Sequence, residues 1–339
     1  MSLPPKEIPL GAMRFNSDSQ KLEYFNGDVW MQVHTFSPNL DGGARGIFSG
    51  GWKPSSPHSA GEIDYITIAT AGNALDFGDL SVPVYAGGAC ASNTRYLHAG
   101  GARNNSNSDV IDYVEFATTG TAVYFGDLTG TLYQGTGSGN QTRGIIYQDA
   151  GNPAGAPAVH SVDYITIASK GDAKEFGEIY GNTNARQNAA ACASPTRILI
   201  AGGGYPAVLS GIDYFTIPTL GNSSDFGDLQ VAARGIGGLS NSTRGVFSGG
   251  GPPSAINIME YVEIATLGDA TAFGDLFVGG GTLAGASSAT RGVWSNGSNS
   301  HNTMSYLTIN TTGAAVDFGD STDSYGDERG SSNAHGGLG

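Results

Sequence analysis

The sequence predicts an all-β protein whose main part is a six-bladed β-propeller. Three observations lead to this prediction: a block repeated six times, a composition suited to short strands, and a final segment that resembles the strand missing from the first repeat. A repeat of this length is typical of propellers and solenoids, in which each unit buries its apolar face against its neighbours.

The repeated block consists of Tyr, six residues, Gly, four residues and Phe-Gly, and no copy contains a gap or an insertion. Its tyrosines are Tyr65, Tyr113, Tyr164, Tyr214, Tyr261 and Tyr306. The glycines are Gly72, Gly120, Gly171, Gly221, Gly268 and Gly313. The phenylalanines, at intervals of 45 to 51 residues, are Phe77, Phe125, Phe176, Phe226, Phe273 and Phe318. We therefore treat the chain as a repeat array.

Two further strands are predicted before each block. An arginine opens an apolar run that often ends in Gly-Gly, and a run of small residues, such as 86–91 or 189–193, precedes most of these arginines. The arginines are Arg45, Arg95, Arg143, Arg197, Arg244 and Arg291. With the Tyr strand and the Phe-Gly strand, this gives four short strands in roughly 50 residues, which is the length of a propeller blade.

The composition supports strands and tight turns. Glycine accounts for 54 of 339 residues and charged residues for only 14%, which does not suit long helices. The formal net charge of −14 argues against nucleic acid and anionic membranes as partners. No run approaches a membrane span, and the first residues lack the apolar region of a secretion signal. Cys90 and Cys192 are expected to be small apolar residues on inner strands, too far apart for a disulfide.

The last part of the sequence indicates how the array closes. Residues 329–339 resemble the small-residue strand that precedes each arginine, but no arginine follows them. The first repeat, in contrast, enters directly at Ala44 and Arg45 without such a strand. We therefore expect the C-terminal strand to complete the first blade and close a propeller over residues 36–339, because closure removes exposed sheet edges.

Residues 1–35 lie outside the repeat and are predicted to form a small β-hairpin arm. Asn26-Gly27 between two alternating runs is a strong hairpin signal. So small a sheet does not bury its own apolar side chains, and it is expected to attach to another surface. The expected attachment residues are Met13, Phe15, Leu22, Tyr24, Phe25 and Trp30.

Two parts of the chain resemble known families. Residues 11–30, GAMRFNSDSQKLEYFNGDVW, look like a short module of tail-fibre and other virion proteins of tailed bacteriophages, marine ones especially. Residues 40–339 resemble the kelch repeat, with Phe where kelch has Trp and with Gly-Gly lost in two copies. The resemblance implies a kelch-like propeller carried on a virion.

The pattern does not favour an enzyme. Kelch-like copper oxidases need two Tyr and two His that converge on the metal, whereas the six histidines here are scattered among different repeats. No metal-binding His pair, phosphate loop or nucleophile elbow is present in the sequence. We expect no catalytic residue, no cofactor and no metal, although calcium in an Asp/Asn-rich loop stays open.

Residues present in every copy are expected to be structural, because one active site does not need six identical parts. The arginines are predicted to form a ring of ion pairs or carbonyl contacts, with carboxylates after Phe-Gly as candidate partners. Binding is expected in the variable loops that follow the Gly-Gly strands. The candidate binding residues are Trp52, Lys53, His58, Arg103, Asn104, His160, Tyr205 and His301.

The function expected from these observations is that of a bacteriophage virion protein, as a tail-fibre, nozzle-associated or capsid-decorating component. It would be assembled in the host cytoplasm, become extracellular after lysis, and occur in many copies or as a homo-oligomer. Its expected partners are other virion proteins, bound through the arm, and host cell-surface glycans. The alternative is a free bacterial propeller that binds glycans or proteins.

Overall fold

The computed structural model describes residues 9–16, 21–32, 44–54, 58–103, 106–148, 161–179, 186–251, 256–295 and 301–339. The chain divides into two compact units, Met1–Asp41 and Gly42–Gly339, which we call unit 1 and unit 2. The prediction of an all-β fold is confirmed: the described residues form 27 strands in seven small antiparallel sheets, with a single short 3-10 helix.

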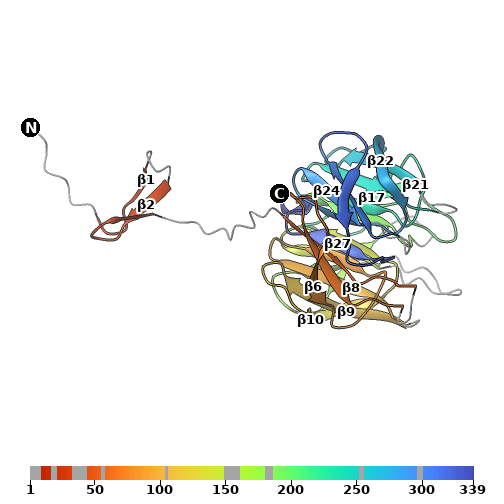
Figure 1. Ribbon diagram of the computed structural model, residues 1–339, viewed down its shortest axis with the longest axis horizontal. Helices are drawn as coiled ribbons and strands as arrows, with labels where there is room; N and C mark the ends of the chain where they lie inside the picture. The colour runs from red at the N-terminus through yellow and green to blue at the C-terminus, as the bar shows by residue number, and fades with distance from the viewer. Residues whose placement is uncertain are drawn as a thin grey trace, which may run out of the picture. The chain divides into compact units, whose positions relative to one another are not determined.

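The strands of unit 1 form one sheet in the order β1-β2-β3 (Figure 1). They are β1 (Met13–Asn16), β2 (Lys21–Phe25) and β3 (Trp30–Gln32). Side chains alternate between the two faces of a strand, so the register Met13↔Tyr24↔Met31 places these three residues on one face. That face is exposed at Met13 (63%) and Phe15 (66%). On the other face, Arg14 lies 4.2 Å above the ring of Trp30.

Unit 2 consists of six four-stranded sheets, each with the same strand order within the residues described. Sheet 1 contains β27 (Arg329–Ser332), β4 (Arg45–Ser49), β5 (Glu62–Thr67) and β6 (Leu75–Asp79). Sheet 2 contains β7 (Gly88–Ala91), β8 (Arg95–Arg103), β9 (Ser106–Glu115) and β10 (Val123–Leu132). Sheet 3 contains β11 (Thr136–Gly139), β12 (Arg143–Tyr147), β13 (Ser161–Thr166) and β14 (Lys174–Glu178).

The remaining three sheets repeat this pattern. Sheet 4 contains β15 (Ala190–Ala193), β16 (Arg197–Ala201), β17 (Gly211–Thr216) and β18 (Ser224–Asp228). Sheet 5 contains β19 (Gly237–Ser240), β20 (Arg244–Ser248), β21 (Ile256–Glu263) and β22 (Thr271–Gly280). Sheet 6 contains β23 (Ala284–Ser287), β24 (Arg291–Ser295), β25 (Thr303–Thr308) and β26 (Val316–Asp320), and the helix η1 (Gly336–Leu338) follows sheet 1.

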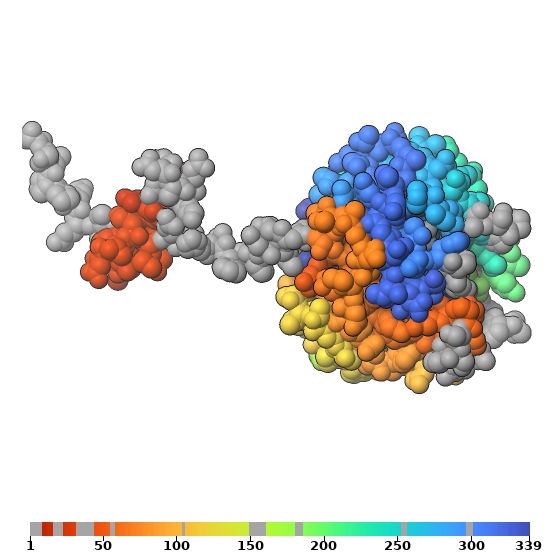
Figure 2. All heavy atoms as spheres, in the orientation of Figure 1, coloured from red at the N-terminus to blue at the C-terminus, as the bar shows by residue number. Residues whose placement is uncertain are grey.

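The first sheet combines strands from the two ends of unit 2. Strand β27 pairs with β4 in the register Arg329↔Ser49 to Ser332↔Gly46. Early and late residues therefore lie side by side, as the neighbouring orange and blue atoms in Figure 2 illustrate. The first strands of the sheets, which we call the inner strands, contact one another in the order β7, β11, β15, β19, β23 and β27, and β27 also contacts β7. This order of contacts is consistent with a propeller-like fold.

The apolar core lies between the sheets. Each of the six clusters of buried side chains takes its residues from two neighbouring sheets, and one cluster joins sheet 6 to sheet 1. Within every sheet the repeated Tyr packs edge-on against the repeated Phe, with ring centroids 5.7 to 6.2 Å apart. Cys90 and Cys192 are buried on β7 and β15 and form no disulfide, as expected.

Both glycines of the repeated block are needed for close contact between sheets. The Gly221 N–H donates to the carbonyl oxygen of Phe176 in the preceding sheet at 3.0 Å. A Cβ on the neighbouring Gly177 would lie only 2.2 Å from the carbonyl oxygen of Gly221. The same hydrogen bond and the same Gly-Gly approach occur at all six junctions, from sheet 6 to sheet 1 included. The block is therefore repeated because it forms the junction between sheets.

Candidate functional site

The six repeated arginines join neighbouring sheets through backbone carbonyl groups. Arg143 Nη1 donates to the carbonyl oxygens of Ile217 at 2.9 Å and Pro218 at 3.2 Å, in the next sheet. Its guanidinium also lies 5.1 Å from the ring centre of Tyr164 in its own sheet. Equivalent carbonyl and Tyr contacts occur for the other five arginines. Of the two predicted arrangements, ion pairs and carbonyl contacts, the carbonyl contacts are present in all six copies.

The residues after Phe-Gly were expected to pair with these arginines, but in the described residues the arginines that form ion pairs use other acids. Arg95 pairs with Glu115 at 2.8 Å and Arg244 pairs with Glu263 at 2.7 Å, both on the Tyr strand of the same sheet. The residues after Phe-Gly form no ion pair with the arginines. Their backbone carbonyls accept hydrogen bonds from the turn of the next sheet. They are Asp79, Asp127, Glu178, Asp228, Asp275 and Asp320.

Sequence reasoning missed a second repeated group, a buried acid immediately before the Tyr in five copies. Asp112 accepts hydrogen bonds from the backbone and the side chain of Ser81, both at 2.8 Å. Asp163 holds Thr129 in the same way. Each of these carboxylates fixes the segment that leaves the preceding sheet, so the acid is structural. The repeated Asp-Tyr pair was a visible signal for it.

Three of the predicted binding residues lie together in the loop after β4. The ring of Trp52 stacks on His58, with centroids 5.5 Å apart and planes at 5°. Lys53 binds Glu62 at 2.5 Å and Asp323 at 3.6 Å. Burial opposes the charged form of Lys53, but these acidic partners outweigh it, and the pKa of Lys53 is raised. The charge of Lys53 is therefore already paired with Glu62 and Asp323.

The other predicted loop residues belong to different sheets. Arg103 is exposed at the end of β8, Tyr205 is exposed after β16, and His301 is exposed before β25. No contact brings these three together in the structure. Asn104 and His160 lie outside the described residues, as does the side chain of Leu22 in unit 1.

A ring of six left-handed residues precedes the inner strands, two positions before each of them. Gln134 N–H donates to the carbonyl of Ala86 at 2.8 Å, and Asn188 N–H donates to that of Gln134 at 3.0 Å. The series continues around the sheets and closes where Ala86 N–H donates to the carbonyl of Asp327 at 3.0 Å. One junction differs, since Asp327 N–H donates to Thr282 Oγ1 at 3.1 Å. These residues, the left-handed ring, are Ala86, Gln134, Asn188, Gly235, Thr282 and Asp327.

Comparison with known proteins adds no assignment at this point. No model of a known protein family matches the chain, and no curated protein matches it significantly. The functional argument therefore depends on the residues of this chain.

A polar and aromatic cluster is built on the left-handed ring. Tyr85 and Tyr133, at equivalent positions in sheets 2 and 3, make an edge-on contact with ring centroids 6.2 Å apart. Gln134 Nε2 lies 3.3 Å from the hydroxyl of Tyr133. Burial raises the pKa of both tyrosines, and the charge of Asp327 adds to the effect. We call Tyr85, Tyr133, Gln134 and Asp327 the tyrosine–aspartate cluster.

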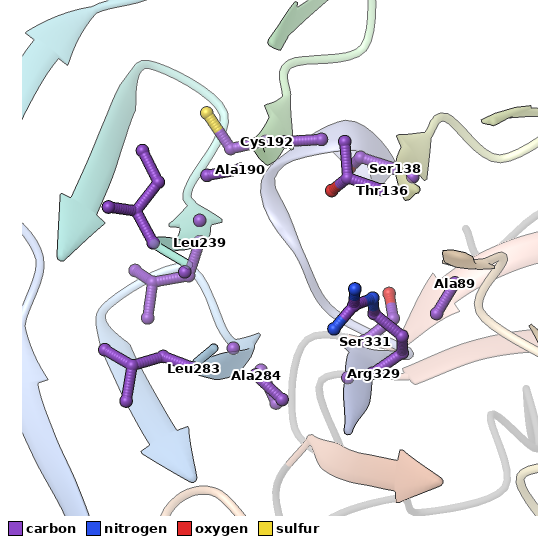
Figure 3. A pocket seen from close by; sticks show the side chains of 18 of the residues that line it. Ala89, Thr136, Ser138, Ala190, Cys192, Leu239, Leu283, Ala284, Arg329 and Ser331 are labelled. Atoms are coloured by element: carbon purple, nitrogen blue, oxygen red, sulfur yellow. The ribbon is translucent and has the colours of Figure 1, made fainter. Parts of the chain in front are cut away.

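A cavity of about 50 Å³ lies among the inner strands, and its lining includes Asn188, Gly235 and Thr282 of the left-handed ring. Arg329 extends its guanidinium into it, whereas the thiol of Cys192 points away (Figure 3). Arg329 Nε donates to the carbonyl of Gly87 at 2.6 Å, and its Nη1 donates to that of Glu328 at 2.8 Å. At the other end of the inner strands, His335 Nε2 lies 2.9 Å from the carbonyl oxygen of Ala91.

Two classes of site receive no support from the described residues. No group of three or more His, Cys, Asp or Glu there has the arrangement needed to hold a metal ion. No helix within the described ranges is long and apolar enough to cross a membrane. The tyrosine–aspartate cluster is the strongest candidate for binding, because the buried Oδ1 of Asp327 accepts no hydrogen bond from the described residues.

Buried titratable groups near the inner strands predict the pH dependence of stability. Burial raises the pKa of Glu328 to about 8, although Ser295 donates a hydrogen bond to it. Burial lowers the pKa of His98 to about 3 and that of His335 to about 4, from an ordinary value of 6.5. The folded state thus binds the extra proton of Glu328, whereas the unfolded state binds those of the histidines.

We expect the free energy of unfolding to increase as the pH falls from about 8 to 6.5, because Glu328 then takes up a proton in the folded state. Burial also raises the pKa of other acids, Asp327 among them, and these act in the same direction. Below pH 6.5 the two histidines oppose this gain, because they are protonated only in the unfolded state. Melting temperatures measured across this range test the expectation. Glu328→Gln should flatten the upper part of the profile, and an unchanged slope in that variant would assign the effect to another group.

Proposed function

We propose that the six sheets of unit 2 are the blades of a closed, kelch-like propeller. Three repeated contacts support the proposal: the inner strands contact one another in a cycle, the six apolar clusters bridge successive sheets, and the arginines bind carbonyls of the next sheet. The pairing of β27 with β4 supplies the strand that the first repeat lacks. A closed ring also leaves few sheet edges open to other chains.

We propose further that the protein is a virion component of a tailed bacteriophage, in which unit 1 attaches the propeller to the particle. The observation that carries this proposal is the separate three-stranded sheet with an exposed apolar face at Met13, Phe15, Tyr24 and Met31. Exposed apolar faces of this kind are typical of protein contact sites. Residues 11–30 resemble a module of phage tail-fibre and other virion proteins, which suggests that the partner is another virion protein.

Mass spectrometry of intact particles, purified from lysates of the source culture, tests the virion assignment. The expected result is a constant copy number of this chain per particle, set by the symmetry of its attachment position. A chain that stays in the soluble fraction would instead support the second candidate, a free propeller that binds glycans or proteins. The tyrosine–aspartate cluster is the feature that favours this second candidate.

Two changes to unit 1 test the attachment role directly. Deleting Met1–Asp41 is expected to leave the melting temperature of unit 2 unchanged and to abolish incorporation into particles. The double variant Met13→Asp/Phe15→Asp should have the same effect within the full chain, because both side chains are exposed and neither supports the sheet. Leu75→Asp is the matched control, since Leu75 is 57% exposed on unit 2. Incorporation of the double variant at the level of the control would refute the role of unit 1.

A further inference from the structure

The left-handed ring carries side chains where glycine would be the least strained residue. A left-handed conformation is strained for a residue with a Cβ, and Gly235 shows that glycine fits the position. Five of the six positions nevertheless carry a side chain, and four of these are polar: Gln134, Asn188, Thr282 and Asp327. Strained residues gather at functional sites in many proteins, so this ring is a reason to look for a ligand there.

Asp327 is the polar group of the ring that most requires a partner. Its Oδ1 is buried and accepts no hydrogen bond from the described residues. Arg329, two residues further along the chain, forms no direct ion pair with it, and its N–H groups bind carbonyls and Asn188. Burial raises the pKa of Asp327, and the nearby charge of Arg329 opposes that shift. A buried carboxylate oxygen without a donor is costly, and a hydroxyl group of a ligand would remove that cost.

The side chains around Asp327 define what such a ligand contains. Tyr85 and Tyr133 are half-buried and present aromatic surface beside the acid. At Gly281, the position equivalent to these tyrosines in sheet 6, a Cβ would meet no atom nearer than 4.0 Å. The cluster therefore has aromatic walls on one side and open space on another.

Several ligand classes fit this arrangement poorly. A metal ion would need more carboxylates than the single one present, and none is grouped there among the described residues. Nucleic acid is disfavoured by the net charge of −14. A ligand with several hydroxyl groups and an apolar C–H face satisfies the carboxylate, the amide of Gln134 and the two aromatic rings together.

We propose that the tyrosine–aspartate cluster binds a saccharide unit, with Asp327 accepting a sugar hydroxyl and with Tyr85 and Tyr133 packing against its C–H face. A glycan end enters this site at the start of the inner strands. The inference deepens the proposed contact with surface glycans by naming its site, and it is tested separately from attachment to a particle.

The experiment is a titration of the full chain with saccharides, followed by saturation-transfer NMR. The probes are glucose, galactose, mannose, N-acetylglucosamine and glucuronic acid, each at millimolar concentration. The expected result is saturation transfer to at least one neutral sugar, at C–H protons of one face. Asp327→Asn keeps the size and the left-handed preference of the residue, and it should weaken binding roughly tenfold to a hundredfold, since the charged acceptor is lost.

Two controls separate binding from folding. Asp323→Asn removes a carboxylate of the same chemistry from an exposed position, and it should leave the affinity unchanged. The melting temperature of Asp327→Asn is measured as well, because the variant also removes the attraction between Asp327 and Arg329. A loss of affinity in a variant that still unfolds cooperatively near the wild-type temperature assigns the loss to binding. Tyr85→Phe/Tyr133→Phe keeps the aromatic walls and should bind with a smaller loss than Asp327→Asn.

The outcomes distinguish this inference from the proposed function. Absence of transfer to every probe, or equal affinity in Asp327→Asn and wild type, would overturn the saccharide site and leave the virion role intact. Binding of a peptide instead of any sugar, lost in Asp327→Asn, would also overturn it. Sugar binding that depends on Asp327, in a chain absent from purified particles, would uphold the site and reject the virion role.

Discussion

Replacing Gly177 with alanine is expected to cause a large loss of stability, because the added methyl group meets the backbone of the next sheet. The new Cβ would lie 2.2 Å from the backbone carbonyl oxygen of Gly221, so sheets 3 and 4 must separate. Overpacking against a backbone atom that cannot move aside costs about 3 kcal/mol or more. Thermal unfolding followed by circular dichroism should show a melting temperature lower by roughly 6 to 10 °C.

Gly279→Ala is the matched control, because the nearest atom to its new Cβ is 3.5 Å away, an ordinary contact distance. It should leave the melting temperature close to that of the wild type. Equal melting temperatures for Gly177→Ala and the wild type would mean that the junction between these sheets is wider than the structure indicates.

Truncating one repeated arginine, by Arg143→Met, is expected to lower the free energy of unfolding by about 2–3 kcal/mol. The variant keeps the aliphatic part of the side chain but removes the charged hydrogen bonds to the carbonyls of Ile217 and Pro218. It also removes the contact with the face of Tyr164. Chemical denaturation with urea, followed by tryptophan fluorescence, measures the change.

Arg103→Met serves as the control for lost charge. Arg103 is exposed, so its truncation should change stability by no more than about 0.5 kcal/mol. Arg143→Lys should lie between the two, since one ammonium group replaces a planar donor that reaches two carbonyls and stacks on a ring. A loss in Arg103→Met as large as that in Arg143→Met would show that overall charge, rather than the junction, sets the effect.

The repeat allowed the all-β fold and its strands to be predicted, because the same physical demand acts six times. Phe176 and Tyr164 must pack against each other, and Gly177 must allow the next sheet to approach, so these residues recur at fixed spacing. The order of strands within a sheet followed from the same spacing. The arginines were predicted to form ion pairs or carbonyl contacts for the same reason, and each donates to carbonyls of the next sheet while none pairs with the residue after Phe-Gly.

The candidate site could not be predicted from the repeat, because it depends on the side chain that each copy carries at the left-handed position before its inner strand. The residues of the left-handed ring are Ala, Gln, Asn, Gly, Thr and Asp in chain order, and no pattern in the sequence marks that position. Arg329 begins the segment that was interpreted only as the closing strand, and Asp327 lies two residues before that segment. Loops were expected to carry binding, but Lys53 is held by acids of its own surroundings.

The pairing of β27 with β4 determines when this protein can finish folding. Arg45 N–H donates to Asn333 Oδ1 across a separation of 288 residues, so the first sheet cannot be completed until residues 329–333 have left the ribosome. During synthesis the edge of β4 and its apolar face stay uncovered while later sheets form. The polypeptide thus emerges with an unpaired strand that competes for partners on neighbouring nascent chains. Slow translation of the residues between β26 and β27, at a high density of ribosomes on one message, would favour pairing of β4 with another copy over pairing with its own β27.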